Sequence, residues 1–115
     1  MGENNEESVW DNAHYLDAVI NRKKRTIPIA SIEYVESRGR KIVLHLGYGE
    51  MTFYSKISDI EEQLVDNGFV RVHQSFMVRM SDISKLSRTA LKCGNIEVPV
   101  SRRYYGELRK MVENY

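Results

Sequence analysis

Two arginines directly follow a serine near the end of the chain, in the step Ser101-Arg102-Arg103. Serine favours the start of a helix, so this step predicts a helix that begins at Ser101 with both cations in its first turn. Cations there oppose the helix dipole, at roughly 0.3–1 kcal/mol for each exposed charge. The free N–H groups, the dipole and two guanidinium groups would instead bind a phosphate well. The other interpretation is that both arginines point into water or pair with Glu36 or Glu97.

A second cationic group surrounds a glycine between two predicted strands, where Arg38, Arg40 and Lys41 flank Gly39. Glycine permits a tight turn and a close approach of the backbone, so this hairpin tip could enter a groove of a nucleic acid. An isolated basic turn is more often simply solvated. The same two interpretations apply to the basic run at residues 22–25, for which we favour solvation.

Residue types that support catalysis or metal binding are present but scattered. His14, His45 and His73 have no metal-ligand spacing to one another, to cysteine or to carboxylates. His73 lies near Ser75, but no acidic partner or oxyanion motif accompanies the pair, so we interpret His73 as structural. Cys93, the single cysteine, sits on a predicted turn and is interpreted as incidental, with redox sensing as the alternative. We expect no enzyme activity, metal or cofactor.

Composition hides an uneven distribution of charge. The net charge is +1, but residues 1–17 contain five acidic and no basic residues, which leaves 17 basic and 11 acidic residues and a charge of +6 for residues 18–115. A basic domain suits a polyanionic partner without proving one. The acidic N-terminus is not a signal peptide, and no apolar run is long enough to span a membrane. With one unpaired cysteine, a reducing cytoplasmic location fits best.

The length of 115 residues argues for one domain. We interpret residues 1–13 as a flexible acidic tail or the end of a linker, although Trp10 could dock on the core, and residues 14–115 as the folded domain. Alternating runs divided by turn residues predict short strands. Those strands are expected at residues 15–20, 26–29, 32–36, 41–46, 50–54, 89–92 and 96–100. Ile42, Leu44 and Leu46 share one face, as in a half-buried strand, and Pro99 would suit an edge strand.

Two segments have helical patterns. Residues 58–61 have the spacing of a capping box, and Ile57, Ile60 and Leu64 then repeat at helical intervals up to Gly68. The segment after Ser101 carries one apolar stripe, made of Tyr105, Leu108, Val112 and Tyr115. The predicted architecture is therefore mainly antiparallel β with two short helices.

One segment is more specific than any of these patterns. The stretch Phe69–Val78 (FVRVHQSFMV) resembles the most characteristic segment of the LytTR family of DNA-binding domains. Asp82-Ile83, a hairpin and the stretch Val98–Tyr105 (VPVSRRYY) follow as they do in that family, and Ile32–Glu36 with its basic loop resembles the family's upstream strand. The match runs in order over about residues 16–115.

The resemblance implies an elongated fold of three packed antiparallel sheets with small helices. It implies transcription regulation, with loops that read neighbouring major grooves of double-stranded DNA and two copies on tandem direct repeats. We expect the free protein to be mainly a monomer, because no amphipathic dimer helix or heptad is visible in the sequence. Family members commonly follow a receiver domain of a two-component response regulator. No receiver fits within 115 residues, so we expect either an excised C-terminal domain, which the acidic start favours, or a stand-alone regulator.

The family's base-contacting positions match Arg40 in the basic loop, Gln74 after the Val-His pair, and Arg103 in the last helix. Glutamine and arginine have suitable donors and acceptors for adenine and guanine edges. Gln74 departs from the Arg, Lys or Asn that is usual there, and Arg79 stands where Asn is common, so the DNA sites read could differ.

Phosphate-holding roles are expected for Arg38, Lys41 and Arg102, and we add Arg79 to the candidate DNA-binding residues. With only two short, widely separated helices, no helix-turn-helix competes with this interpretation. The main alternative is a β-rich protein-interaction or ligand-sensing module that binds no DNA. RNA binding is less well supported, because the signature of the common RNA-recognition motif is absent.

Overall fold

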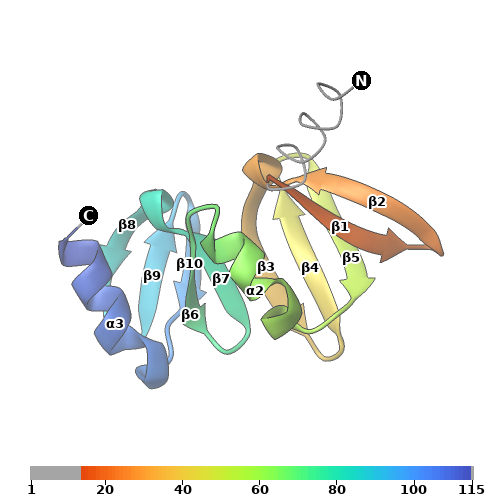
Figure 1. The fold of residues 1–115 in the computed structure, drawn as a ribbon. Helices are drawn as coiled ribbons and strands as arrows, with labels where there is room; N and C mark the ends of the chain where they lie inside the picture. Colours follow the sequence, from red (N-terminus) through yellow and green to blue (C-terminus); the bar gives the residue numbers. More distant parts are fainter. Residues whose placement is uncertain (1–13, 115) are drawn as a thin grey trace.

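The computed structural model describes residues 14–114. These residues form three antiparallel sheets and two α-helices in an elongated body of 50 × 31 × 24 Å (Figure 1). The expected mainly β architecture with a C-terminal helix is thus confirmed. The predicted tail at residues 1–13 lies outside the described residues.

The first sheet is a two-stranded hairpin of β1 (Tyr15–Ile20) and β2 (Lys23–Pro28). The second strand was expected only from Thr26, but it begins at Lys23. Asn21 and Arg22 both have positive φ, 54° and 66°, which gives a two-residue turn that pairs Ile20 with Lys23. Most of the basic run therefore lies on a strand, not in the turn.

The central sheet has five strands in the order β5-β4-β3-β7-β6. The strands are β3 (Ile32–Arg38), β4 (Lys41–Leu46), β5 (Gly49–Tyr54), β6 (Phe69–His73) and β7 (Phe76–Arg79). The expectation that β4 is half-buried was wrong, because Val43 and His45 are buried as well as the three predicted residues. The Tyr34 ring covers His45, at 3.9 Å between ring centroids.

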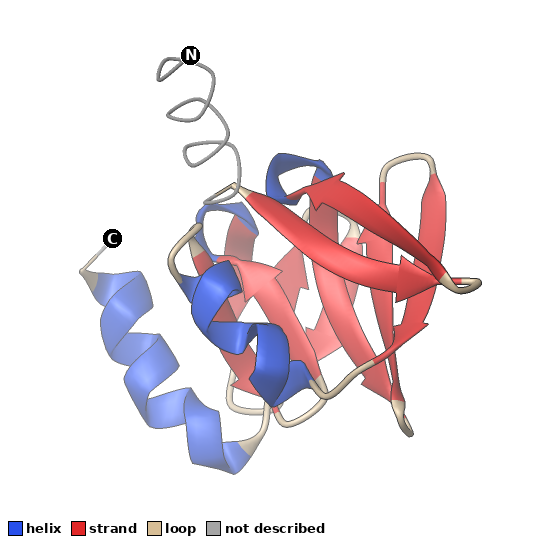
Figure 2. Cartoon of the chain, turned by 45° about the vertical axis from the view of Figure 1, so that its right-hand side comes forward, coloured by secondary structure: helices blue, strands red, loops and turns tan. Residues whose placement is uncertain are grey.

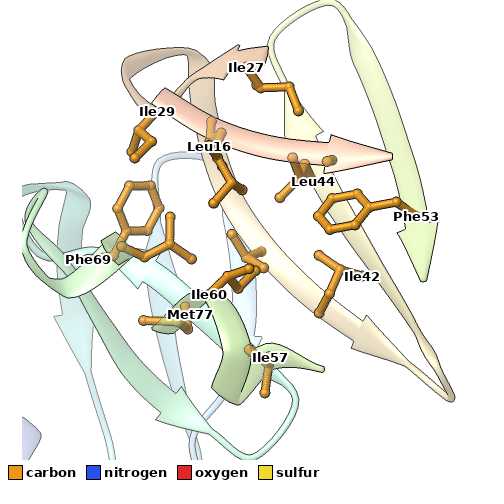
Figure 3. Close-up of a cluster of buried hydrophobic side chains, with 14 of the residues drawn as sticks. Leu16, Ile27, Ile29, Ile42, Leu44, Phe53, Ile57, Ile60, Phe69 and Met77 are labelled. Atoms are coloured by element: carbon orange, nitrogen blue, oxygen red, sulfur yellow. The ribbon is translucent and has the colours of Figure 1, made fainter. Parts of the chain in front are cut away.

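The helix α2 (Ile57–Val65) connects β5 to β6 and packs its apolar side onto the central sheet. Ile57 and Ile60 belong to a buried cluster that also contains Leu16, Phe69 and Met77 (Figure 3). The helix is where it was predicted, but the capping box is not formed. Lys56 occupies the N-cap position and makes no side-chain capping hydrogen bond, because the helix starts one residue before Ser58.

The third sheet, in the order β10-β9-β8, consists of β8 (Ile83–Leu86), β9 (Ala90–Cys93) and β10 (Ile96–Pro99). Pro99 lies on an edge strand, as predicted. Cys93 is the last residue of β9 and is buried, so its predicted place on a turn was wrong. The single turns η1 (Ile29–Ser31) and η2 (Met80–Asp82) link the sheets.

The helix α3 (Arg102–Glu113) closes the second core of the molecule. Its buried Leu108 packs with Val72 and Val78 of the central sheet and Val98 of the third sheet. The other face of the central sheet packs on the first core. This packing fixes α3 relative to the central sheet and to the turns between its strands. Figure 2 shows α3 beside the strands. No helix among the described residues is long and apolar enough to cross a membrane.

Candidate nucleic-acid interface

Three segments that are distant in sequence lie along one edge of the molecule, the lower edge in both Figure 1 and Figure 2. They are the β3–β4 turn, the β6–β7 turn and the start of α3. Backbone hydrogen bonds connect them in pairs. The N–H of Ser37 donates to the carbonyl of Ser75 at 2.8 Å, and the N–H of Ser101 donates to the carbonyl of Val72 at 3.0 Å. The fold thus brings the segments of all three predicted base-contacting residues to one edge.

The β3–β4 turn presents Arg40. Gly39 has a φ of 61°, which allows the two-residue turn that pairs Arg38 with Lys41. The carbonyl of Arg40 accepts a hydrogen bond from the N–H of Ser55 at 3.2 Å. Its side chain is exposed and has no ion pair within residues 14–114. The backbone at this tip is therefore held while the guanidinium is available.

Arg38 is bound to an acidic neighbour on its own strand. Its Nε and Nη2 donate to the two carboxylate oxygens of Glu36, at 2.9 and 3.1 Å. The second partner of that carboxylate is His45, whose Nε2 lies 3.0 Å away. The hydrogen bond from Arg38 is the main reason that the pKa of Glu36 is lowered, and it raises the pKa of Arg38. A phosphate would have to compete with Glu36 for this cation.

Lys41 lies beside an aromatic residue that the sequence analysis did not single out. Its Nζ is 5.1 Å from the ring centroid of Tyr54, which is 75 % exposed. The two residues are directly opposite each other in the β4–β5 pair. An exposed tyrosine hydroxyl can donate to a phosphate, so Tyr54 extends this cationic surface. The position of Tyr54 beside Lys41 follows from the register of β4 and β5, which the sequence did not predict.

The β6–β7 turn presents Gln74, whose side chain is exposed. The carbonyl of Gln74 accepts a hydrogen bond from Nη2 of Arg71 at 2.7 Å. The N–H of Ser75 donates to Nδ1 of His73 at 3.0 Å, and the His73 ring meets Phe76 edge-on at 5.7 Å. His73 therefore orders the turn, as its structural interpretation expected, while the amide of Gln74 faces solvent.

The start of α3 presents Arg102 and Arg103. Ser101 occupies the N-cap position, as predicted, but its hydroxyl makes no capping hydrogen bond and has no partner among the described residues. Both arginines are exposed, and the guanidinium of Arg103 lies 5.4 Å from the ring of Tyr104. Within residues 14–114, neither arginine forms the expected alternative ion pair with Glu36 or Glu97. The exposed cations and the helix start together suit an anion.

A further cation from the β8–β9 turn reaches α3. The guanidinium of Arg88 lies 5.5 Å from the ring of Tyr105, and the N–H of Val100 donates to the carbonyl of Thr89 at 3.0 Å. Arg88 could not be predicted from the sequence, because nothing in its local pattern indicates that the β8–β9 turn lies next to α3.

Arg79 lies elsewhere, at the end of β7 that is remote from the β6–β7 turn (Figure 1). Its Nη2 donates to the carbonyls of Ile29 and Ile32, at 3.1 and 2.6 Å, and its guanidinium stacks on Phe69 at 4.5 Å. These contacts connect η1 to the central sheet. The structure therefore does not bring Arg79 together with the other predicted residues.

The completed edge carries six cationic side chains from three segments, the β3–β4 turn, the β8–β9 turn and the start of α3. They are Arg38, Arg40, Lys41, Arg88, Arg102 and Arg103, all of them exposed. The described residues contain no group of His, Cys, Asp and Glu that could hold a metal ion. An exposed row of cations with an exposed amide between them suits the phosphates and base edges of a nucleic acid.

The family of this chain is identified by its match to a known family of domains. The family model of the LytTr DNA-binding domain matches residues 22–113. The chain belongs to the LytTR family. Its members are DNA-binding modules rather than enzymes, and the resemblance seen in the sequence is confirmed.

The LytTR fold is also found in a solved structure. It is the LytTr DNA-binding domain of a Bacillus cereus protein named as a methyl-accepting/DNA response regulator. The match has a TM-score of 0.68 and 20 % identity, and covers 89 % of this chain and 98 % of that chain. No curated protein matches this chain. At this identity the structural match supports the fold, and the family model carries the assignment to LytTR.

Proposed function

We propose that this LytTR domain binds specific double-stranded DNA sequences in the cytoplasm and regulates transcription as the output domain of a response regulator. The observation that supports this best is the common edge shared by the β3–β4 turn, the β6–β7 turn and the start of α3. The longest extent of the molecule is 50 Å. One turn of B-DNA is about 34 Å, so this edge is long enough to reach successive grooves.

In this proposal Arg40, Gln74 and Arg103 contact base edges. The Arg40 and Arg103 guanidinium groups would each donate two hydrogen bonds to a guanine, and the Gln74 amide would pair with an adenine. All three side chains are exposed on segments whose backbones are fixed by hydrogen bonds. A fixed backbone keeps the donors at a constant spacing, which discrimination between bases requires.

Phosphate contacts are assigned to Arg38, Lys41 and Arg102, and we add Arg88 and Tyr54. Such contacts set the position of the domain on the duplex and carry little sequence information. They also make affinity depend steeply on salt, because each neutralised phosphate releases counterions. Arg79 is left out of this set because its donors are used within the fold.

The proposed DNA partner is a tandem direct repeat that loads two copies of the domain. In this proposal the free domain is a monomer, since neither α2 nor α3 has the heptad pattern of a dimer helix. A receiver domain N-terminal to residue 1 would supply the regulatory input in a full-length protein.

Selection of bound sequences from a random duplex pool, followed by titration of the selected duplex at several salt concentrations, tests the proposal. We expect the selection to enrich a repeated sequence motif. The logarithm of Kd for that motif should rise linearly with the logarithm of the salt concentration. Scrambled duplexes should bind more weakly at every salt concentration. A pool with no enrichment would contradict sequence-specific reading. A lack of any salt-dependent binding would favour the protein-interaction or ligand-sensing alternative.

A further inference from the structure

The side chain of Arg71 lies where the β6–β7 turn, α2 and the start of α3 meet, and it is only 14 % exposed. Its Nε donates to the carbonyl of His73 at 2.9 Å, and its Nη2 donates to the carbonyl of Gln74 at 2.7 Å. Its Nη1 binds the carboxylate of Glu61 on α2 at 2.5 Å. Every nitrogen of this guanidinium therefore has a partner inside the protein.

The two carbonyls that Arg71 binds belong to the peptide groups on either side of the Cα of Gln74. Holding both peptide planes fixes the backbone dihedral angles of Gln74, and with them the direction in which its side chain leaves the turn. This local support matters because the pairing of β6 with β7 is irregular between Arg71 and His73. A regular strand ladder thus does not fix the turn at this point.

A shared aromatic ring connects this turn to α3. The guanidinium of Arg71 lies 5.5 Å from the ring of Tyr104, and that of Arg103 lies 5.4 Å from the same ring. Cation–π contacts of this kind are attractive and favour the planar guanidinium over an ammonium. Tyr104 therefore places the proposed base contacts Gln74 and Arg103 relative to each other through Arg71.

We infer that Arg71 is a positioning residue for DNA reading, which orients Gln74 and holds its turn in register with Arg103. The inference rests on the proposed function of this edge. Arg71 does not act as a phosphate contact, because its side chain is largely buried and Glu61 neutralises its charge.

The free protein provides the first test, through hydrogen exchange of the backbone amides. Lysine keeps the charge of Arg71 but cannot reach two carbonyls and a carboxylate with one planar fork. Arg71→Lys should accelerate exchange at residues 73–76 by about tenfold or more. Arg79→Lys is the matched control, since Arg79 also binds two backbone carbonyls and a ring, but at the far end of β7. Equal exchange in the turn of wild type and Arg71→Lys would overturn the inference.

The second test measures affinity for the selected duplex and for duplexes altered at single base pairs. Arg71→Lys should lose preference at the same base pair as Gln74→Ala, and the double variant should lose no more than either single one. Arg71→Gln should leave the salt slope unchanged, whereas a flattening of about 0.9 would assign Arg71 to a phosphate instead. Losses at different base pairs, or losses that add, would also overturn the inference.

Folding and function are kept apart by two further comparisons. Glu61→Gln keeps Arg71 but removes its charged partner. This variant should show faster amide exchange in the turn and weaker base preference, as Arg71→Lys does, but to a smaller extent. It provides the test if Arg71→Lys folds poorly. If wild type bound no duplex specifically, the proposed function would fail, and exchange in the free protein would still decide whether Arg71 holds the turn. Unchanged discrimination in Gln74→Ala would overturn the positioning role in reading.

Discussion

Glu36 binds the guanidinium of Arg38 through both of its carboxylate oxygens, at 2.9 and 3.1 Å, directly before the exposed tip of the β3–β4 turn. The same carboxylate lies 3.0 Å from Nε2 of His45. The pair holds the Arg38 side chain in one orientation beside the proposed DNA edge. It also gives Glu36 a measurable role in acid stability.

The free energy of unfolding should fall in acid partly because of Glu36. The hydrogen bond from Arg38, followed in importance by that from His45, lowers the pKa of Glu36 below its ordinary value of 4.5. The stabilisation is therefore complete above about pH 4.5 and is lost as the pH falls through the lower pKa of the folded state. Urea unfolding at several pH values should show a smaller acid loss in Glu36→Gln than in wild type. Identical pH dependence would contradict this prediction.

Two neighbouring arginines at the start of α3, Arg102 and Arg103, should have different effects on DNA binding. Arg103→Ala should weaken specific binding by roughly 1–3 kcal/mol and relax preference at one guanine. Arg102→Ala should weaken binding to all sequences about equally and flatten the salt slope by about 0.9. Titration of specific and scrambled duplexes at several salt concentrations measures both effects.

Arg109→Ala is the control for these two variants, because Arg109 is an exposed arginine of the same helix that pairs with Glu113 near its other end. It should bind DNA like wild type. If Arg102 and Arg103 were only solvated, their alanine variants would also match wild type, with slightly higher stability because a cation leaves the positive end of the helix.

The positions of many strands and helices could be predicted because each depends on the pattern of its own segment. The apolar alternation of β4 and the helical repeat of α2 each follow from the periodicity of their own segment. Details that depend on other segments could not be predicted. His45 is buried because Tyr34 stacks on it, and the pairing of β1 with β2 follows from the left-handed turn at Asn21 and Arg22.

In the candidate site, too, residues defined by a local pattern could be predicted, whereas residues that depend on other segments could not. Arg40 and Arg103 are recognisable from the sequence because a glycine turn and a helix start surround them. Arg79 was included because it stands where the LytTR family commonly has Asn, but it lies at the end of β7 that is remote from the β6–β7 turn. Arg71 was passed over because its role depends on an irregular turn and on a tyrosine of α3, which no local pattern indicates.

Cys93 should be unreactive in the native protein. Burial raises the pKa of its thiol, and the charge of Asp82 adds to that effect. Since the thiolate is the reactive form, alkylation should be slow in the folded protein and rapid after unfolding in denaturant. Timed alkylation followed by mass spectrometry measures both rates. Equal rates in the two states would contradict burial and would revive a redox-sensing role.

The assembly should depend on DNA. Sedimentation of the free domain should give a monomer, because neither α2 nor α3 has a heptad pattern. A duplex with two direct repeats should carry two copies, and a duplex with one repeat should carry one copy. A stable dimer without DNA would show that an interface has been overlooked.

Backbone amide NMR shifts of the labelled domain, recorded during titration with the selected duplex, locate the surface that binds DNA. We predict that the largest shifts fall on residues 38–41, 73–75 and 102–104, while the basic β1–β2 hairpin at residues 21–25 changes little. Largest shifts on that hairpin, or shifts spread evenly over the domain, would contradict the claim that this edge reads DNA.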